Sequence, residues 1–221
     1  MSGQDIIVLF EGFSEDKIVN GQEVMLANCT CTLIKSSGLN IIVDTLTPWD
    51  SERLLSALRD HNVLPEDVNY VVCTHGHSDH VGCNHLFPNV EKLIVGRNIS
   101  RRETYFLHNW DTPFIINENV EVVATPGHTR ECVSVIVKGC HVGELGGTVG
   151  ITGDLFEKEG DIFNDSLWRD AGSFNEDVQR VTRSRIASQV DVIIPGHGAP
   201  FRMTREMREE LERQSHNNSS P

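Results

Sequence analysis

The sequence predicts an α+β fold in which layered β-sheets are covered by helices on the outside. Nine short runs rich in β-branched residues recur along the 221 residues, so strands outnumber helices. Helical periodicity is confined to three segments, and strands therefore come in blocks with helices between them. No block is long enough to form a separate domain. We expect one domain over residues 1–213 and a polar, disordered tail over 214–221.

The expected strands are short apolar runs that end at turn residues or at polar side chains. In chain order they cover residues 5–10, 24–34, 40–44, 69–75, 92–96, 120–128, 132–139, 149–154 and 190–198.

The expected helices follow from apolar residues spaced three and four apart. The first spans 50–61, where Asp50 or Ser51 can cap it and three leucines form an apolar stripe. The second spans 174–190, and the third is the charged segment 204–214. The apolar face expected for the second helix consists of Val178, Val181, Ile186 and Val190.

Charge limits the partners of this protein. Lys and Arg number 19 against 32 for Asp and Glu, which gives a net charge of −13. Such a chain repels polyanions at long range, which argues against a protein that wraps nucleic acid. Because screening acts over about 8 Å at physiological salt, a local positive site can still bind a phosphate.

The remaining composition favours an intracellular protein. We expect it in the cytosol and nucleus, and a homodimer stays open. The first ten residues lack the positive charge of a signal peptide, and no run approaches the roughly 20 apolar residues of a membrane span. We therefore expect a soluble, intracellular protein without membrane contact. The six cysteines lie mostly in apolar runs, and we expect them to be reduced core residues.

Residues 74–82 read THGHSDHVG and place three histidines and an aspartate within six positions. Three further apolar runs end in a glycine followed by histidine or aspartate, at His128, Asp154 and His197. Side chains that follow neighbouring strands converge on one edge of a sheet. We expect seven side chains to meet there: His75, His77, Asp79, His80, His128, Asp154 and His197.

Five imidazoles and two carboxylates suit zinc, and iron or manganese are not excluded. Seven donors exceed the needs of one tetrahedral ion and suit two ions with an open position. Two ions about 3.5–4 Å apart serve many hydrolases, because they lower the pKa of a bridging water toward 7. The pattern predicts a hydrolase that uses hydroxide as its nucleophile and leaves the substrate open. A binding protein without turnover is disfavoured, since all seven donors are present.

These motifs, THGHSDH, TPGHT, GD at Asp154 and PGHG, resemble the ordered motif set of the metallo-β-lactamase superfamily over residues 5–203. The resemblance implies an αββα sandwich. It also implies that His75, His77 and His128 hold one metal, that Asp79, His80 and His197 hold the other, and that Asp154 bridges them. Asp79 and Asp154 would then orient the nucleophile, and Asp44 would orient the site from behind.

Asp154 stands where true class B β-lactamases commonly use a cysteine in the second metal site, so antibiotic hydrolysis is not the expected activity. Apart from Asp154 and His197 themselves, the metal site does not require the segments DLFEKEGD and GHGAPFR, and these segments resemble one group within the superfamily. That resemblance implies a zinc endoribonuclease that cuts histone pre-messenger RNA at its 3′ end. A thioester or lactone hydrolase with the same metals stays open.

Basic residues offer two candidate substrate contacts. Arg97, Arg101 and Arg102 lie beside Tyr105 and Phe106, a combination that can hold a single strand of RNA. The alternative is a solvated surface segment. For Arg180, Arg183 and Arg185 we expect the solvated face of a helix.

Overall fold

The computed structural model describes residues 4–216. Its last helix, α5 (Arg205–His216), continues three residues into the segment expected as a tail. The rest of that expected tail, 217–221, lies outside the described residues.

The first half of the structure is a mixed sheet in the order β1-β4-β5-β6-β7-β8-β9. Its strands are β1 (Gln4–Phe10), β4 (Cys31–Ser36), β5 (Leu39–Val43), β6 (Tyr70–Cys73), β7 (Lys92–Val95), β8 (Asn98–Arg101) and β9 (Thr104–Phe106). β5, β6 and β7 run parallel, so their carboxyl ends lie at one edge.

The second half is a sheet in the order β10-β11-β12-β13-β14-β15. Its strands are β10 (Phe114–Ile115), β11 (Val120–Ala124), β12 (Val133–Val142), β13 (Leu145–Gly153), β14 (Val192–Pro195) and β15 (Phe201–Arg202). Over residues 4–216, its one strand pairing with the first half is that of β1 with β12, through Gln4↔Cys140 and Asp5↔His141. The two halves are thus contiguous in sequence and connected by a short ladder.

Alternation along the strands places one core between the two halves and one outside each. Ile34 and Ile41 face the inner core together with Val135 and Ile151 of the second half. Leu33, the neighbour of Ile34, faces outward into a second cluster.

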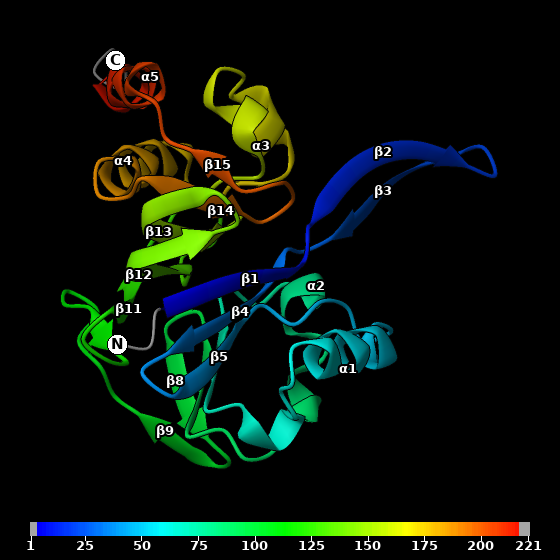
Figure 1. The fold of residues 1–221 in the computed structure, drawn as a ribbon. Coiled ribbons are helices and arrows are strands. Elements are labelled where there is room, and N and C mark those ends of the chain that lie inside the picture. Colours follow the sequence, from blue (N-terminus) through cyan, green and yellow to red (C-terminus); the bar gives the residue numbers. More distant parts are fainter. Residues whose placement is uncertain (1–3, 217–221) are drawn as a thin grey trace.

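Helices cover both outer faces (Figure 1). α1 (Ser51–Asp60) places Leu54 and Leu58 on the first half, near the short helix α2 (Ser78–Val81). α4 (Glu176–Ala187) and α5 pack Ile186, Met207 and Leu211 against the second half. A further helix, α3 (Ser166–Asp170), precedes α4, and three 3-10 turns occupy Pro65–Asp67, Asn84–Leu86 and Glu159–Ile162. The predicted αββα sandwich is confirmed.

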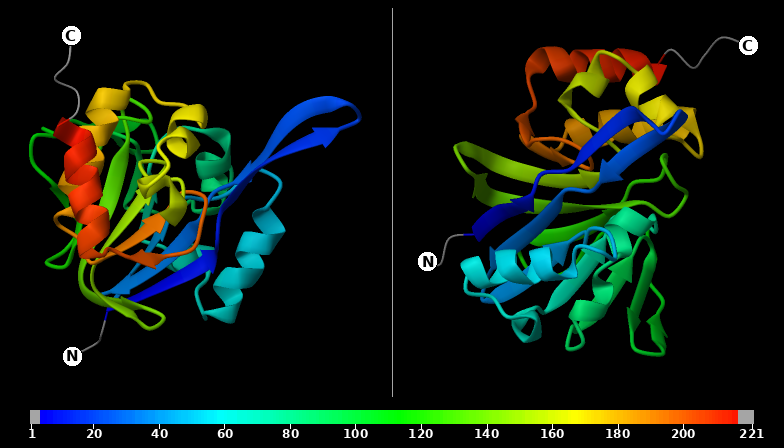
Figure 2. Two further views of the ribbon diagram at one scale, coloured as in Figure 1. Left: turned by 90° about the horizontal axis from the view of Figure 1, so that it is seen from above. Right: turned by 90° about the vertical axis from the view of Figure 1, so that its right-hand side faces the viewer.

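One expected strand, 24–34, is in fact two. It is interrupted at Cys29 and Thr30, between β3 (Gln22–Asn28) and β4. β3 pairs with β2 (Phe13–Val19), a strand that the sequence analysis missed, and Figure 2 shows this hairpin extending away from the body. The interruption lets the Thr30 N–H donate to the Gly196 carbonyl at 2.7 Å, which brings the hairpin base beside His197.

The face expected for the second helix was partly wrong. Val178 and Val181 are 39% and 53% exposed, whereas Ile186 and Val190 are buried as expected. Arg183, expected on a solvated face, is fully buried. It is bound to the Asp161 carboxylate, which leaves no charge on Arg183 unpaired and makes its burial tolerable.

All six cysteines are buried, as expected for core residues, and none is in a disulfide bond over residues 4–216. Over residues 4–216, every helix is too short or too polar to cross a lipid bilayer.

Candidate metal centre

The seven predicted ligands are delivered by strand ends and by one helical turn. β6 ends two residues before His75, and β13 ends directly before Asp154. β14 ends two residues before His197, and His128 lies in the loop that follows β11. Asp79 and His80 lie in α2. Both halves of the sandwich therefore contribute donors at the same edge.

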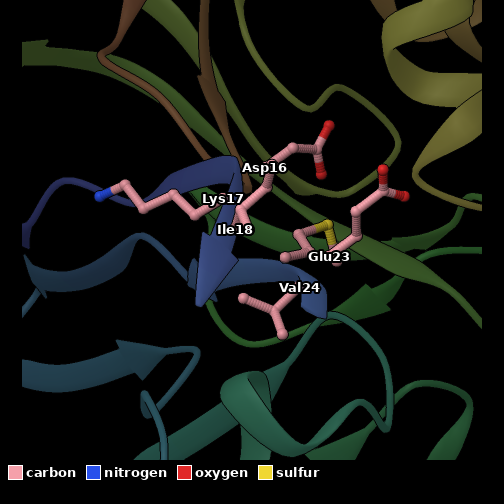
Figure 3. Close-up of a pocket in the computed structure, with 6 residues that line it drawn as sticks. Asp16, Lys17, Ile18, Glu23 and Val24 are labelled. Atoms are coloured by element: carbon pink, nitrogen blue, oxygen red, sulfur yellow. The ribbon is translucent and has the colours of Figure 1, made fainter. Parts of the chain in front are cut away.

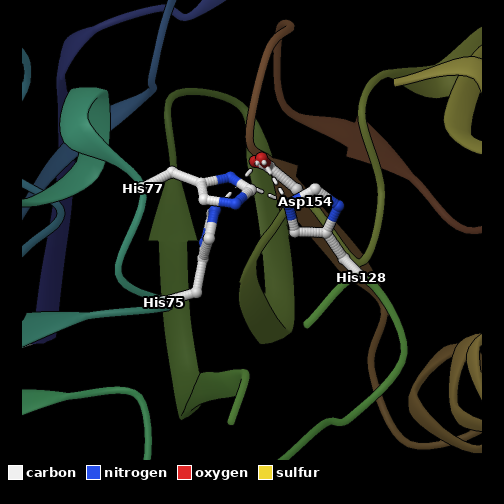
Figure 4. Close-up of side chains that lie close together, drawn as sticks. All are labelled: His75, His77, His128 and Asp154. Carbon is white, nitrogen blue, oxygen red and sulfur yellow. Dashed lines mark hydrogen bonds and ion pairs between the residues drawn. The ribbon is translucent and has the colours of Figure 1, made fainter. Parts of the chain in front are cut away.

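The first cluster consists of His75, His77 and His128, gathered around Asp154 (Figure 4). Asp154 Oδ2 lies 3.4 Å from the Nε2 atom of His75 and 3.4 Å from that of His128. His77 turns its Nδ1 toward the same point, 3.1 Å from His128 Nε2. Three imidazole nitrogens and one carboxylate oxygen thus share one small volume.

The second cluster consists of Asp79, His80 and His197. Asp154 Oδ1 lies 3.2 Å from His80 Nε2 and 3.4 Å from His197 Nε2. Asp79 Oδ2 lies 3.8 Å from each of these two nitrogens. The two oxygens of Asp154 therefore face different clusters.

The outer ring nitrogens of two histidines are held by backbone carbonyls. His128 Nδ1–H donates to the Gly172 carbonyl at 2.7 Å, and His197 Nδ1–H donates to the Asn28 carbonyl at 3.0 Å. A carbonyl can only accept, so both Nδ1 atoms carry the proton. When the ring is neutral, each Nε2 atom then presents its lone pair toward Asp154.

Asp44 lies behind the second cluster, as the resemblance implied. Its Oδ2 lies 2.9 Å from His80 Nδ1, while its Oδ1 accepts the Thr74 N–H at 2.7 Å. This buried carboxylate orients the His80 ring and anchors the backbone just before His75.

Two glycines make the close approach possible. A Cβ at Gly196 would lie 2.0 Å from Asp154 Oδ1, and one at Gly153 would lie 2.2 Å from Thr74 Oγ1. Gly153 also has φ +51°, which favours glycine. The glycines beside Asp154 and His197 are thus needed for packing at the centre.

The surroundings of the histidines shift their pKa values in opposite directions. Burial lowers the pKa of His75 well below its ordinary value and also lowers the pKa of His128, so both are neutral. Burial opposes charge on His80 too, but Asp154 and Asp44 raise its pKa well above the ordinary value. Neutral imidazole is the form that binds a metal, so His75 and His128 are already in that form.

In the second cluster, by contrast, the histidines have raised pKa values and bind protons. Burial opposes a charge on His197, but the nearby Asp154 carboxylate raises the pKa of His197 to about 9. Burial likewise opposes ionisation of Asp154, yet His80, His75 and His197 hold its pKa well below the ordinary value. A metal at this cluster would replace protons as the partner of Asp154.

The donors fit a metal centre. Among the described residues, His75 Nε2, His80 Nε2 and Asp154 Oδ1 are buried without a hydrogen-bond partner. Buried polar atoms are normally satisfied, and imidazole and carboxylate are the donors that zinc, iron and manganese accept. Two bound cations would therefore give these buried nitrogen and oxygen atoms the partners that the chain does not supply.

Raising the pH from 6.5 to 9 is expected to strengthen metal binding at the second cluster and to lower the melting temperature of the metal-free protein. The pKa of His197 is raised from 6.5 to about 9, so its contribution to stability is full below pH 6.5 and is lost as the pH rises through 9. Over the same range the metal competes with fewer protons. Metal titrations and thermal melts at several pH values measure both trends, and a second-cluster affinity that is flat with pH would contradict the assignment.

The structure separates the three candidate substrate contacts. β8 begins at the histidine edge, because Asn98 pairs with Val95, and Val95 with Cys73. β8 runs antiparallel to β7 and away from the histidines, so Arg101 and Arg102 lie at the opposite edge of the sheet. Only Arg97 lies at the edge of the histidines.

The sequence analysis missed Glu157, although it lies in the DLFEKEGD segment thought unnecessary for the metal site. Glu157 is 2% exposed, and its Oε2 lies 3.9 Å from His197 Nε2. Burial and the charge of Asp154 raise its pKa to about 8. The one sequence feature that could have indicated Glu157 is its position three residues after the ligand candidate Asp154.

A hollow of about 540 Å³ lies on the β2–β3 hairpin (Figure 3). Its lining comes from the two strands alone and contains none of the seven ligand candidates: Asp16, Lys17, Ile18, Glu23, Val24 and Met25.

Comparison with known sequences identifies relatives of the chain. The family described as the metallo-beta-lactamase superfamily matches residues 25–197. Metallo-beta-lactamase domain-containing protein 1 of Xenopus laevis is 42% identical over 208 residues, which cover 91% of this chain and 83% of that protein. The Homo sapiens protein of that name is 41% identical over 169 residues, which cover 75% of this chain and 60% of the human protein. The match thus spans less than two thirds of the human relative.

Solved structures share the fold at low identity. A protein of this family from Thermotoga maritima has a TM-score of 0.64 at 19% identity, covering 90% of this chain and 99% of its own. The metallo-beta-lactamase FIM-1 of Pseudomonas aeruginosa, in its mono-zinc form, has a TM-score of 0.63 at 17% identity, with coverage of 94% and 91%. A quorum-quenching N-acyl homoserine lactone lactonase has a TM-score of 0.61 at 20% identity, with coverage of 88% and 90%.

Proposed function

Because the chain belongs to the metallo-β-lactamase superfamily of metal-dependent hydrolases, we propose that it is a dinuclear zinc hydrolase of phosphodiester bonds, acting as an endoribonuclease. Its substrate in this proposal is histone pre-messenger RNA, cut at the 3′ end. The RNA assignment rests on the resemblance carried by the DLFEKEGD and GHGAPFR segments.

The observation that carries the proposal is the position of Asp154. Its Oδ1 and Oδ2 atoms lie 3.2–3.4 Å from imidazole Nε2 atoms of different clusters. A carboxylate in this position can hold two cations at a fixed short spacing, which suits hydrolysis of phosphates and acyl groups.

When bound, two divalent ions would supply a water of lowered pKa and positive charge for the oxygens of the substrate. The chain provides their positions. His75, His77 and His128 would hold one ion, Asp79, His80 and His197 the other, and Asp154 would contact both. Asp79 would also orient the attacking water, since its side chain is 19% exposed while His80 and His197 are buried. His77 is exposed as well, so the substrate would approach from the side of these two residues.

A thioester or lactone hydrolase is the second candidate, because Arg101 and Arg102 do not lie beside the metal centre to grip an RNA strand. The same pair of ions serves acyl transfer equally well, since both reactions need a nucleophilic water and a clamp for developing negative charge. A small uncharged ester would also meet less repulsion from a chain of net charge −13.

The two candidates are separated by offering one zinc-loaded preparation three substrates. These are an RNA that carries the 3′ end of a histone transcript, an acyl-glutathione thioester and an N-acyl homoserine lactone. Site-specific cleavage of the RNA is expected, and RNA left intact while an ester is cleaved would overturn the endoribonuclease proposal. An Asp154→Asn preparation purified in parallel is the control, because RNA cleavage that survives this change in protein that has lost metal comes from a contaminating nuclease.

A further inference from the structure

The Glu157 carboxyl group occupies a place that a metal ligand would occupy. The residue is 2% exposed, and glutamate is almost never buried so deeply unless it is paired. Its Oε2 reaches to 3.9 Å from His197 Nε2, the atom that faces the second cluster. The carboxyl group therefore borders the second cluster on the side of His197.

The backbone of Glu157 is tied down, but its carboxyl group is not. The Glu157 N–H donates to Asp161 Oδ2 at 2.7 Å, and the Glu157 carbonyl accepts the His197 N–H at 2.9 Å. In the part of the chain that the structure describes, no hydrogen bond ends on the Glu157 side chain. The one charged contact printed for this carboxyl group is the 3.9 Å approach to His197, so the group has coordination capacity left for a cation.

The spacing suits a shared ion. Two donors that bind one ion at about 2.1 Å lie roughly 3–4 Å apart, depending on the angle between them. The 3.9 Å between Glu157 and His197 falls within this range, as do the 3.8 Å between Asp79 and His197 and the 3.4 Å between Asp154 and His197.

We propose that Glu157 is a fifth protein ligand of the second metal ion. The inference rests on the two-ion centre proposed above and deepens it. The second site then has three carboxylates and two imidazoles, whereas the first has three imidazoles and one carboxylate. An oxygen-rich set of five donors accepts ions with five or six ligands, such as Mn²⁺, as well as zinc, so Mn²⁺ serves as a probe of this site.

Metal titrations of Glu157→Gln test this assignment. Metal-free wild-type protein, Glu157→Gln and a matched control, Glu159→Gln, are titrated with Mn²⁺ followed by electron paramagnetic resonance and with Zn²⁺ followed by calorimetry. Glu159 is an exposed glutamate two residues away. We expect two binding events in the wild type and the control, and in Glu157→Gln an unchanged first event with a second event at least about tenfold weaker.

Thermal melts of the metal-free proteins distinguish a ligand from a structural residue. Removing a buried carboxyl group beside Asp154 is expected to leave the melting temperature of metal-free Glu157→Gln unchanged or higher, while the rise on adding Mn²⁺ becomes smaller. A lower metal-free melting temperature with wild-type Mn²⁺ affinity would overturn the proposal. Glu157→Asp, which keeps the charge but withdraws the oxygens by one methylene, should also weaken the second event, and wild-type affinity in that variant would count against a direct ligand.

The outcomes also separate this inference from the proposed function. A wild-type protein that binds one ion overturns both. A wild-type protein that binds two ions, with Glu157→Gln binding both equally well, overturns only the role of Glu157.

Discussion

Replacing Asp154 by asparagine is expected to lower the rate of hydrolysis by about 10³-fold. Asp154 alone among the seven candidate ligands places oxygens against both clusters, at 3.2–3.4 Å from four imidazole nitrogens. Asparagine keeps the shape but removes the negative charge that two adjacent cations require. The protein should therefore lose one ion and the fixed spacing of the pair.

Elemental analysis and single-turnover rates, measured on the same preparation, test this expectation. Asp111→Asn is the matched control, because Asp111 is exposed and lies in the loop after β9. The control should keep full metal content and activity. An Asp154→Asn protein that holds two ions and hydrolyses substrate at the wild-type rate would rule out a bridging carboxylate.

Replacing Arg183 by methionine is expected to lower the free energy of unfolding by about 3–5 kcal/mol. Arg183 binds both oxygens of the Asp161 carboxylate, and its Nη1 donates to the Leu155 carbonyl at 2.8 Å. Both side chains of the ion pair are fully buried. Without the guanidinium group, Asp161 is left as an uncompensated charge in the core.

Urea denaturation measures this loss, and Arg180→Met is the matched control. Arg180 lies on the same helix, but its carboxylate partners Asp165, Glu176 and Asp177 are 40–68% exposed. Surface pairs of this kind contribute at most about 1 kcal/mol. If both variants lost the same free energy of unfolding, the buried ion pair would contribute no more to stability than the surface pairs do. Metal affinity should fall with Arg183→Met as well, because Asp161 and Leu155 hold the loop that follows Asp154.

The fold class could be predicted from the sequence because most strands and helices keep the apolar spacing typical of their type. The ligand set was visible for a related reason, since each donor directly follows an apolar run or lies within THGHSDH. The structure gathers all seven donors, while their roles as ligands stay proposals. Asp44 could be placed behind the site only through the family resemblance.

The features that the sequence did not reveal depend on contacts between distant residues. Arg183 was expected in solvent because its partner, Asp161, lies 22 positions earlier and carries no local signal. Glu157 was missed since a glutamate in a charged segment normally faces water. The β2–β3 hairpin was missed because β2, FSEDKIV, mixes charged and apolar residues without clear alternation, having almost nothing to pack against.

The short ladder between β1 and β12 has a consequence for how the molecule assembles. Residues 4–106 and 114–216 each form one half of the sandwich, and the exposed loop between them holds the fully accessible Leu107. If the chain were cut in this loop, one fragment would keep His75 to His80 and the other would keep His128, Asp154 and His197. Neither fragment could retain both ions alone. In the proposed two-ion centre, metal would then act as a removable cross-link, and reassembly of the fragments would depend on metal concentration as a ligand-induced association does.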